Sequence, residues 1–446
     1  MKVVLPGLRL VLSGLVGVSA LGLYVGCTTG SGVRNASVGA SSERQPADTA
    51  TLVTTDNFRL LPDEHWYGGS QELELQRFQD IGRQVVAAQV GLQKQMKNSP
   101  KERVFHAKQT ACLIGHLSIS SANASDAQRA AFSGMFTEGR NYTVLARYSN
   151  GVGITRTDDF PDVRGFSIKI LNVEDEADHS LKAVDIPMTD SPVAFGKDIG
   201  EFVEFMNASA NPGFASVNVT KYFAKYPAVF HALNKALVKF DQNPAKMNFW
   251  SGNPFLMNGN HAFKFNVRPE AGGDQPINKA LAENLSSNSS LSSKVQAYVE
   301  NKWEGVESVL GPNATHDSIS ETLSRGGIRY IASIQLDVDP DKTPIGDAVT
   351  SRHPEGAMEE WTEANSPSIP VGVLDFPPQN IDDPQLQEIC HSARFTPGHY
   401  VSQHRPLGNV GRGRIFAYQA SANGRGASAT EVNEQVVLKI LDQVKQ

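Results

Sequence analysis

The stretch Asp162-Val163-Arg164-Gly165-Phe166-Ser167-Ile168-Lys169-Ile170 decides the fold class of this chain of 446 residues. Its apolar side chains Phe166, Ile168 and Ile170 alternate with Ser167 and Lys169, and a period of two predicts a β-strand with one buried face. Segments 263–267 and 330–336 alternate in the same way. Strands of this half-buried kind are typical of antiparallel sheets.

Helical patterns lie before and between these strands. In residues 72–96 the apolar residues Leu73, Leu75, Phe78, Ile81, Val85 and Val86 recur at helical spacing. Further helical stretches are expected over 199–206, 220–240 and 278–303. Strands that helices separate so widely favour an α+β domain, and we expect a closed antiparallel β-barrel with surrounding helices.

The first 27 residues resemble an export signal. Lys2 and Arg9 accompany an apolar run over 10–25, which is short for a membrane-spanning helix, and Gly26 then precedes Cys27. A cysteine at this place resembles the lipobox of bacterial lipoproteins, in which Cys27 is lipidated after cleavage. An uncleaved anchor and an ordinary signal peptide are the alternatives.

Residues 28–56 are rich in Ser, Thr, Gly and Ala, and this composition predicts a flexible linker before a folded domain over 57–446. The predicted location is the bacterial cell envelope, with a lipid anchor in the membrane and the domain either facing the periplasm or at the outer membrane. The net charge of -6 and the absence of a Lys/Arg run argue against a nucleic-acid partner.

Apart from Cys27, the chain has two cysteines, Cys112 and Cys390. In an oxidising compartment they are either a disulfide or two buried free thiols, and the sequence leaves both readings open. No Cys/His spacing indicates a zinc site.

Several short motifs carry candidate chemistry. They are Arg103-Val104-Phe105-His106-Ala107-Lys108, Ala146-Arg147-Tyr148-Ser149-Asn150, the stretch over 162–169 quoted above, Asp190-Ser191-Pro192-Val193-Ala194-Phe195, the segments 257–264, 339–347 and 366–367, His404-Arg405-Pro406-Leu407-Gly408, and Arg412-Gly413-Arg414-Ile415-Phe416-Ala417-Tyr418. Taken alone, His106 would be read as a packed or surface histidine, and Tyr418 as a core tyrosine beside an arginine.

In this order the motifs resemble those of the catalase superfamily. The resemblance covers roughly residues 78–418 and is greatest to a small, divergent branch of catalase-related peroxidases and haem proteins that act on fatty-acid hydroperoxides. It implies a catalase-like barrel over 57–446 that binds b-type haem. The chain ends soon after Tyr418, so the C-terminal additions of large catalases are not expected.

The resemblance implies that Tyr418 is the proximal ligand of the haem iron. A phenolate ligand is the catalase arrangement. Arg414 lies one helical turn before Tyr418, where it is placed to donate a hydrogen bond to the phenolate and to lower its pKa.

On the other face of the haem, the resemblance makes His106 the distal acid–base, which takes a proton from the peroxide and returns it to the leaving oxygen. Ser149 is the expected partner of the second ring nitrogen and would fix the tautomer. Arg103, Arg147 and Arg405 are the expected partners of the haem propionates.

Two phenylalanines, Phe195 and Phe202, are either the apolar wall over the haem or plain core. The family has an asparagine on the distal side, where this chain has Asp190; an ionised carboxylate only accepts hydrogen bonds, whereas a buried, protonated one donates. Gln109 replaces a glycine after the His-Ala-Lys motif, and Gln419 begins a changed continuation after Tyr418.

The function that these residues predict is a haem-dependent, peroxide-decomposing enzyme of the catalase/peroxidase kind, with hydrogen peroxide as substrate, that protects the cell envelope. Two alternatives remain: an enzyme that converts fatty-acid or other organic hydroperoxides, and a non-catalytic haem-binding lipoprotein. Asp190 puts rapid dismutation of hydrogen peroxide in doubt. If the protein is an oligomer, we expect a smaller assembly than the tetramer of large catalases, because the linker stands where their intertwined arm would be.

Overall fold

The computed structural model describes residues 59–95, 102–155, 157–158, 161–210, 215–273, 275–277, 290, 311–337 and 354–445. The predicted signal segment over 1–27 with Cys27, the linker over 28–56, the helical stretch over 278–303 apart from Ser290, and the motif over 339–347 lie outside the described residues.

Eight strands form a closed antiparallel barrel in the order β5-β4-β3-β2-β1-β9-β8-β7, and the pairing of β5 with β7 closes the ring. A ninth strand, β6, pairs with β7. The strands are β1 (Gln109–Ile119), β2 (Asn141–Asn150), β3 (Arg164–Glu174), β4 (Leu181–Thr189), β5 (Phe249–Trp250), β6 (Phe255–Met257), β7 (His261–Pro269), β8 (Ile328–Leu336) and β9 (Ile369–Phe376). The α+β class and the barrel predicted from the alternating segments are confirmed.

The barrel interior is filled by alternate side chains of these strands. Tyr148, Phe166 and Tyr330 lie fully buried in this core, and the two tyrosine hydroxyls share a hydrogen bond of 2.7 Å. The outer face of β3 departs from the half-buried pattern that we expected. Lys169 is also fully buried there, because helices and loops cover this side and Asp185 of β4 binds its ammonium at 2.7 Å.

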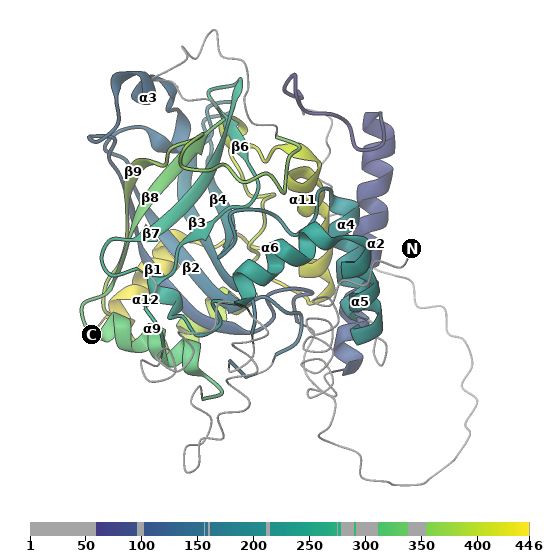
Figure 1. The fold of residues 1–446 in the computed structure, drawn as a ribbon. Helices are drawn as coiled ribbons and strands as arrows, with labels where there is room; N and C mark the ends of the chain where they lie inside the picture. The colour runs from purple at the N-terminus through teal and green to yellow at the C-terminus, as the bar shows by residue number, and fades with distance from the viewer. Residues whose placement is uncertain are drawn as a thin grey trace.

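The helices surround the barrel. They are α2 (Gln71–Gln95), α3 (Asp126–Ala131), α4 (Ile199–Ala210), α5 (Ala215–Lys225), α6 (Pro227–Leu237), α9 (Ala314–Ser324), α10 (Pro384–Ser392), α11 (Gly408–Gly424) and α12 (Glu434–Val444). Figure 1 shows α2, α4, α5 and α11 gathered on one side of the barrel. The stretch expected over 220–240 is two helices, because Pro227 has no N–H to continue α5 and instead begins α6.

Helix α2 matches the predicted helix over 72–96, but not all of the expected face is buried. Phe78, Ile81 and Val85 pack against α4 and α11, whereas Leu73 and Val86 are exposed. Glu74 is fully buried beside Leu73, because the guanidinium of Arg412 on α11 binds its carboxylate at 2.8 Å.

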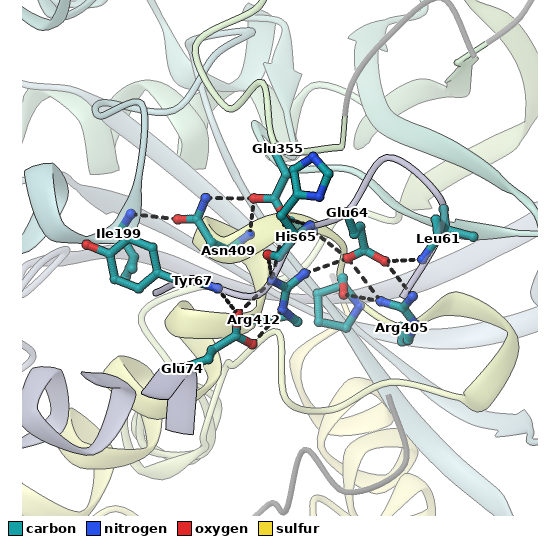
Figure 2. A network of polar contacts seen from close by, with 12 residues as sticks. Leu61, Glu64, His65, Tyr67, Glu74, Ile199, Glu355, Arg405, Asn409 and Arg412 are labelled. Atoms are coloured by element: carbon teal, nitrogen blue, oxygen red, sulfur yellow. Dashed lines mark hydrogen bonds and ion pairs between the residues drawn. The ribbon is translucent and has the colours of Figure 1, made fainter. Parts of the chain in front are cut away.

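A buried network of charges joins α2 and α11 to the segment that leads into the domain (Figure 2). Arg412 of α11 binds Glu64, Glu74 and Glu355, and Arg405 binds Glu64. None of the described helices is both long and apolar enough to span a membrane.

Cys112 of β1 and Cys390 of α10 form a disulfide, with their Cα atoms 5.9 Å apart. Of the two alternatives that the sequence left open, the structure has the disulfide. The bond ties α10 to the outer face of the barrel close to the segment that carries His106.

Candidate functional site

The loop that carries His106 is tied to the end of β2. The backbone N–H of His106 donates to the carbonyl of Gly151 at 2.8 Å, and that of Ala107 donates to Val152 at 3.0 Å. His106 itself has a φ of 57°, a backbone conformation that costs energy in residues other than glycine. Such a strained backbone conformation persists only where the surrounding structure fixes it. It is therefore consistent with an imidazole that is held in one orientation.

The structure brings His106 and Ser149 together. Nδ1 of His106 lies 3.1 Å from Oγ of Ser149, and the serine is buried. A hydrogen bond at Nδ1 leaves Nε2 as the ring nitrogen that is available for a substrate.

Gly165, in the Arg-Gly-Phe stretch of β3, provides the space for this pair. A Cβ atom built on Gly165 would lie 2.5 Å from Nδ1 of His106 and 2.7 Å from Oγ of Ser149. Ser149, Gly165 and Thr189 are register partners on three adjacent strands and therefore share the outer face of the barrel. The imidazole lies on this face.

Burial, together with the nearby guanidiniums of Arg147, Arg414 and Arg103, lowers the pKa of His106 from 6.5 to about 3. The ring is therefore neutral at pH 7 and can accept a proton. The residue nevertheless keeps partial exposure.

Helix α11 presents Arg414 and Tyr418 one turn apart. Nη2 of Arg414 donates to the phenol oxygen of Tyr418 at 2.8 Å, and Nη1 donates to Oδ1 of Asn253. Both side chains are half-buried. The contact between Arg414 and Tyr418 is the one that the resemblance implies.

The same helix touches the segment that leads to His106. The N–H of Val104 donates to Oγ of Ser421 at 3.3 Å, and the charge of Arg414 acts on His106. The predicted proximal tyrosine and the predicted distal histidine therefore belong to one region, between α11 and the outer face of the barrel.

Three guanidiniums gather beside this region. Arg103 donates through Nη2 to the carbonyls of Cys390, His391 and Ala393, each at 3.1 Å. Arg425 binds two of the same carbonyls, at 2.7 Å to His391 and 2.8 Å to Ala393.

The third guanidinium, that of Arg147, donates to the carbonyls of His106 and Ala107 at 2.9 and 3.2 Å and to Oε1 of Gln109 at 3.1 Å. Gln109, which stands where the resemblance implies a glycine, in turn donates to Gln387 of α10. Gln109 therefore bridges Arg147 and α10.

Burial lowers the pKa of all three arginines, to about 9 for Arg147 and about 10 for Arg425. Neighbouring guanidiniums add to this effect, that of Arg394 in the case of Arg425, and the carboxylate of Glu102 opposes it. Three guanidiniums and one carboxylate leave a surplus of two positive charges at pH 7. Nη1 of Arg103 is buried and has no hydrogen-bond partner in the part of the chain that the structure describes. Surplus charge with an unused donor fits an anionic ligand.

The structure places Arg405 elsewhere. Its guanidinium binds Glu64 at 2.6 Å and the carbonyl of Arg59 at 2.6 Å, within the network of Figure 2. Arg425 was not identified from the sequence, and its guanidinium donates to two of the carbonyls that Arg103 also binds. It follows Tyr418 by seven residues, a spacing that puts two side chains on one face of a helix, and this signal was available in the sequence.

Asp190 follows β4 and is fully buried. Its Oδ1 accepts from the N–H of Arg164 at 3.2 Å, and its Oδ2 has no partner among the described residues. Burial raises the pKa of this carboxyl to about 7, although Lys239 and Arg164 act against the rise. Asp190 is therefore partly protonated near pH 7 and is then a hydrogen-bond donor.

The two phenylalanines lie in different clusters. The ring centroid of Phe202 is 5.2 Å from that of Phe105, the neighbour of His106. Phe195 packs instead with Tyr222 and Phe223 under α5 and α6. No group of three or more His, Cys, Asp or Glu residues suited to a metal ion occurs within the described ranges.

No protein-family model matches this chain, and no curated protein sequence matches it. Among solved structures, it is similar to a fungal catalase, with a TM-score of 0.51 and 18% identity over 74% of this chain and 61% of that one. It is also similar to catalase A from Saccharomyces cerevisiae, with a TM-score of 0.51 and 17% identity over 74% of this chain and 62% of that one. The chain thus spans about three fifths of each catalase, and at these identities the similarity shows the fold: a catalase-like barrel.

Proposed function

We propose that this chain is a haem-dependent enzyme that decomposes peroxides, with Tyr418 as the proximal ligand and His106 as the distal acid–base. The observation that carries the proposal is the joint placement of two pairs, Arg414 with Tyr418 and His106 with Ser149, at one region between α11 and the barrel.

The donor set fits a haem. When bound, the iron would supply the redox chemistry, and a phenolate is the ligand that suits it. Arg414 donates a hydrogen bond at 2.8 Å to the phenol oxygen of Tyr418, the atom that would bind the iron. Arg103, Arg147 and Arg425, with their surplus of two positive charges, suit the two propionates.

His106 has the properties of a general base. Its pKa of about 3 keeps the ring neutral, and Ser149 holds Nδ1, so that Nε2 is left to take a proton from a peroxide and to return it to the leaving oxygen. Phe202, whose ring lies near Phe105, would exclude water on this side.

We expect the protonation state of Asp190 to affect how a peroxide is bound. When protonated it donates a hydrogen bond as an asparagine amide would, and when ionised it only accepts. Because its pKa is raised to about 7, the donor form is present mainly at and below neutral pH. Hydrogen peroxide remains our first candidate substrate, and fatty-acid and other organic hydroperoxides are the second.

The proposed setting is the bacterial cell envelope, with Cys27 lipidated and the domain held at the membrane surface. The disulfide between Cys112 and Cys390 supports an oxidising compartment, because disulfides are rare in the reducing cytosol. A membrane tether would also bring lipid hydroperoxides within reach.

The first test is the absorption spectrum of the purified chain with haem, beside its Tyr418→Phe variant. We expect a Soret band with high-spin ferric features of phenolate ligation in the wild type, and altered features in the variant. A chain that takes up no haem would overturn the proposal.

A second test separates an enzyme from a binding protein. His106→Ala should abolish peroxide turnover while haem stays bound, and His231→Ala, on the exposed surface of α6, should leave turnover unchanged. Equal turnover by wild type and His106→Ala would favour the non-catalytic haem-binding lipoprotein. Rates on hydrogen peroxide, a small alkyl hydroperoxide and a fatty-acid hydroperoxide would then rank the substrates.

A further inference from the structure

The disulfide lies at the centre of the contacts that hold the three guanidiniums. Cys390 is in the last turn of α10, and Cys112 is in β1, six residues after His106. Both are fully buried, and 278 residues separate them in the chain. The bond therefore fixes the C-terminal end of α10 against the strand that continues from the His106 segment.

The carbonyls at this end of α10 are the acceptors for Arg103 and Arg425. The last carbonyls of a helix have no partner within the helix and carry its negative end. Here the carbonyl of Cys390 itself accepts from Arg103, and the carbonyls of His391 and Ala393 accept from both arginines.

A second link runs from α10 to Arg147. Gln387, one turn before Cys390, accepts from the side chain of Gln109 at 2.6 Å, and Gln109 accepts from Arg147 at 3.1 Å. Each of the three guanidiniums is thus held, directly or through Gln109, by α10. Because like charges repel, the cluster depends on these shared acceptors to stay together.

Other contacts of α10 are noncovalent. Asp383 caps its N-terminus, and Leu386 packs in the cluster that also contains Cys112 and residues of α12. With these contacts in place, we expect loss of the disulfide to loosen the last turn of α10 rather than to unfold the domain.

We propose that the Cys112–Cys390 disulfide positions the anion-binding arginines. The rate at which an anionic cofactor dissociates from the chain would then depend on this bond. The inference rests on the proposed function, in which the anion is the propionate edge of haem. Reduction by a dithiol would break the S–S bond and leave two thiols, with the two electrons and two protons supplied by the dithiol.

The test is the rate of haem dissociation, measured by transfer to an excess of apomyoglobin, for wild type, dithiol-reduced wild type and Cys112→Ala/Cys390→Ala. We expect dissociation to be about tenfold faster without the disulfide, in the range seen when groups that support a ligand are removed. Unchanged dissociation in a folded double variant would overturn the proposal.

Val437→Ala is the matched control, because Val437 of α12 packs in the same cluster as the disulfide. It lowers stability without touching α10's carbonyls, and haem dissociation should stay near the wild-type rate. If Val437→Ala accelerates dissociation as much as loss of the disulfide does, the effect is one of general stability and the proposal fails.

A double-mutant cycle tests whether the disulfide acts on haem dissociation through Arg103 and Arg425. In the background Arg103→Ala/Arg425→Ala, removal of the disulfide should no longer accelerate dissociation, because the groups that it positions are gone. If removal of the disulfide still accelerates haem dissociation fully in this background, the disulfide does not act through these two arginines.

Should the chain take up no haem, the proposed function fails, and hydrogen exchange decides the positioning claim separately. Faster exchange of the amides in 103–109 after loss of the disulfide would support it. Unchanged exchange there would overturn it.

Discussion

The imidazole of His106 lies against Gly165, and a methyl group on this glycine would come within 2.5 Å of Nδ1. The backbone of β3 is paired on both sides, with β2 and β4, and cannot move aside. The histidine and the glycine therefore form one unit, in which the strand provides the surface on which the ring is oriented.

Gly165→Ala should displace the His106 ring and break its hydrogen bond to Ser149. We expect peroxide turnover to fall by about 100-fold, because a shift of about 1 Å in a catalytic group has an effect of this size. Haem binding and its spectrum should remain. Gly82→Ala is the control, since a Cβ there meets only the methyl of Ala420 at 3.6 Å; equal losses in both variants would contradict the role of Gly165.

Asp190→Asn should stabilise the protein at alkaline pH and not at acidic pH. The pKa of Asp190 rises from 3.8 to about 7 on folding because the carboxyl is buried. The folded state thus binds the proton more tightly, so the wild type loses stability as pH rises from about 4 through 7. The variant does not titrate, and its gain should grow over this range to at most about 4 kcal/mol.

Urea unfolding at pH 4 and pH 8 measures this difference. The same variant should flatten the decline of peroxide turnover above pH 7, because an asparagine amide donates at every pH. A gain in stability that is the same at both pH values would show that the carboxyl of Asp190 does not titrate as expected.

The sequence was sufficient to predict a barrel because apolar residues recur at every second position in the segments 166–170, 263–267 and 330–336. It was not sufficient for the outer face, where Lys169 looks like an exposed residue until Asp185 of another strand is placed beside it. Periodicity describes one element at a time, and burial of a charged side chain depends on a partner that is distant in the sequence.

At the candidate site, too, the sequence predicted some contacts and missed others. His106 with Ser149, and Arg414 with Tyr418, come together as the motif order implied. Arg405 was expected from its motif to be a partner of the propionates, and in the structure its guanidinium binds Glu64 instead. The spacing of Arg425 from Tyr418 was a usable signal for one arginine of the cluster, but the carbonyls that these arginines bind at the end of α10 depend on the fold and could not be read from the sequence.

His404 should make the protein sensitive to acid. Its Nε2 accepts from the N–H of Met135 at 3.1 Å, and Nδ1 faces the carbonyl of Leu256 at 3.1 Å, an arrangement that requires the neutral ring. Burial lowers its pKa from 6.5 to about 4. The unfolded chain therefore binds more protons, and stability present above pH 6.5 is lost as pH falls towards 4.

This residue should contribute a slope of about 1.4 kcal/mol per pH unit in that range. His404→Gln keeps one acceptor and one donor but does not titrate, so its free energy of unfolding should fall less steeply than that of the wild type between pH 6.5 and 4. His106 adds a similar dependence in both proteins and cancels in the comparison. Parallel pH curves for the two proteins would refute the assignment.

Arg412 should be among the most costly residues to replace. Its guanidinium binds Glu74 through two hydrogen bonds of 2.8 Å and Glu64 at 2.6 Å, and all three side chains are fully buried (Figure 2). Arg412→Met would leave the buried carboxylate of Glu74 without its counter-charge and would leave Glu64 with Arg405 alone. Removal of one partner from such a buried cluster costs about 3–5 kcal/mol. The loss should be smaller at pH 5 than at pH 7, because the carboxylates can then take up protons.

Arg83→Met is the matched control, because Arg83 forms an ion pair with Asp80 on the exposed side of α2. Exposed pairs contribute about 0–1 kcal/mol, and this variant should unfold nearly as the wild type does. Chemical unfolding of both variants at pH 7 and pH 5 gives the comparison. Equal, small losses would mean that the charges of Figure 2 do not hold α11 in place, and Arg412 would then have no part in positioning Arg414 and Tyr418 further along the same helix.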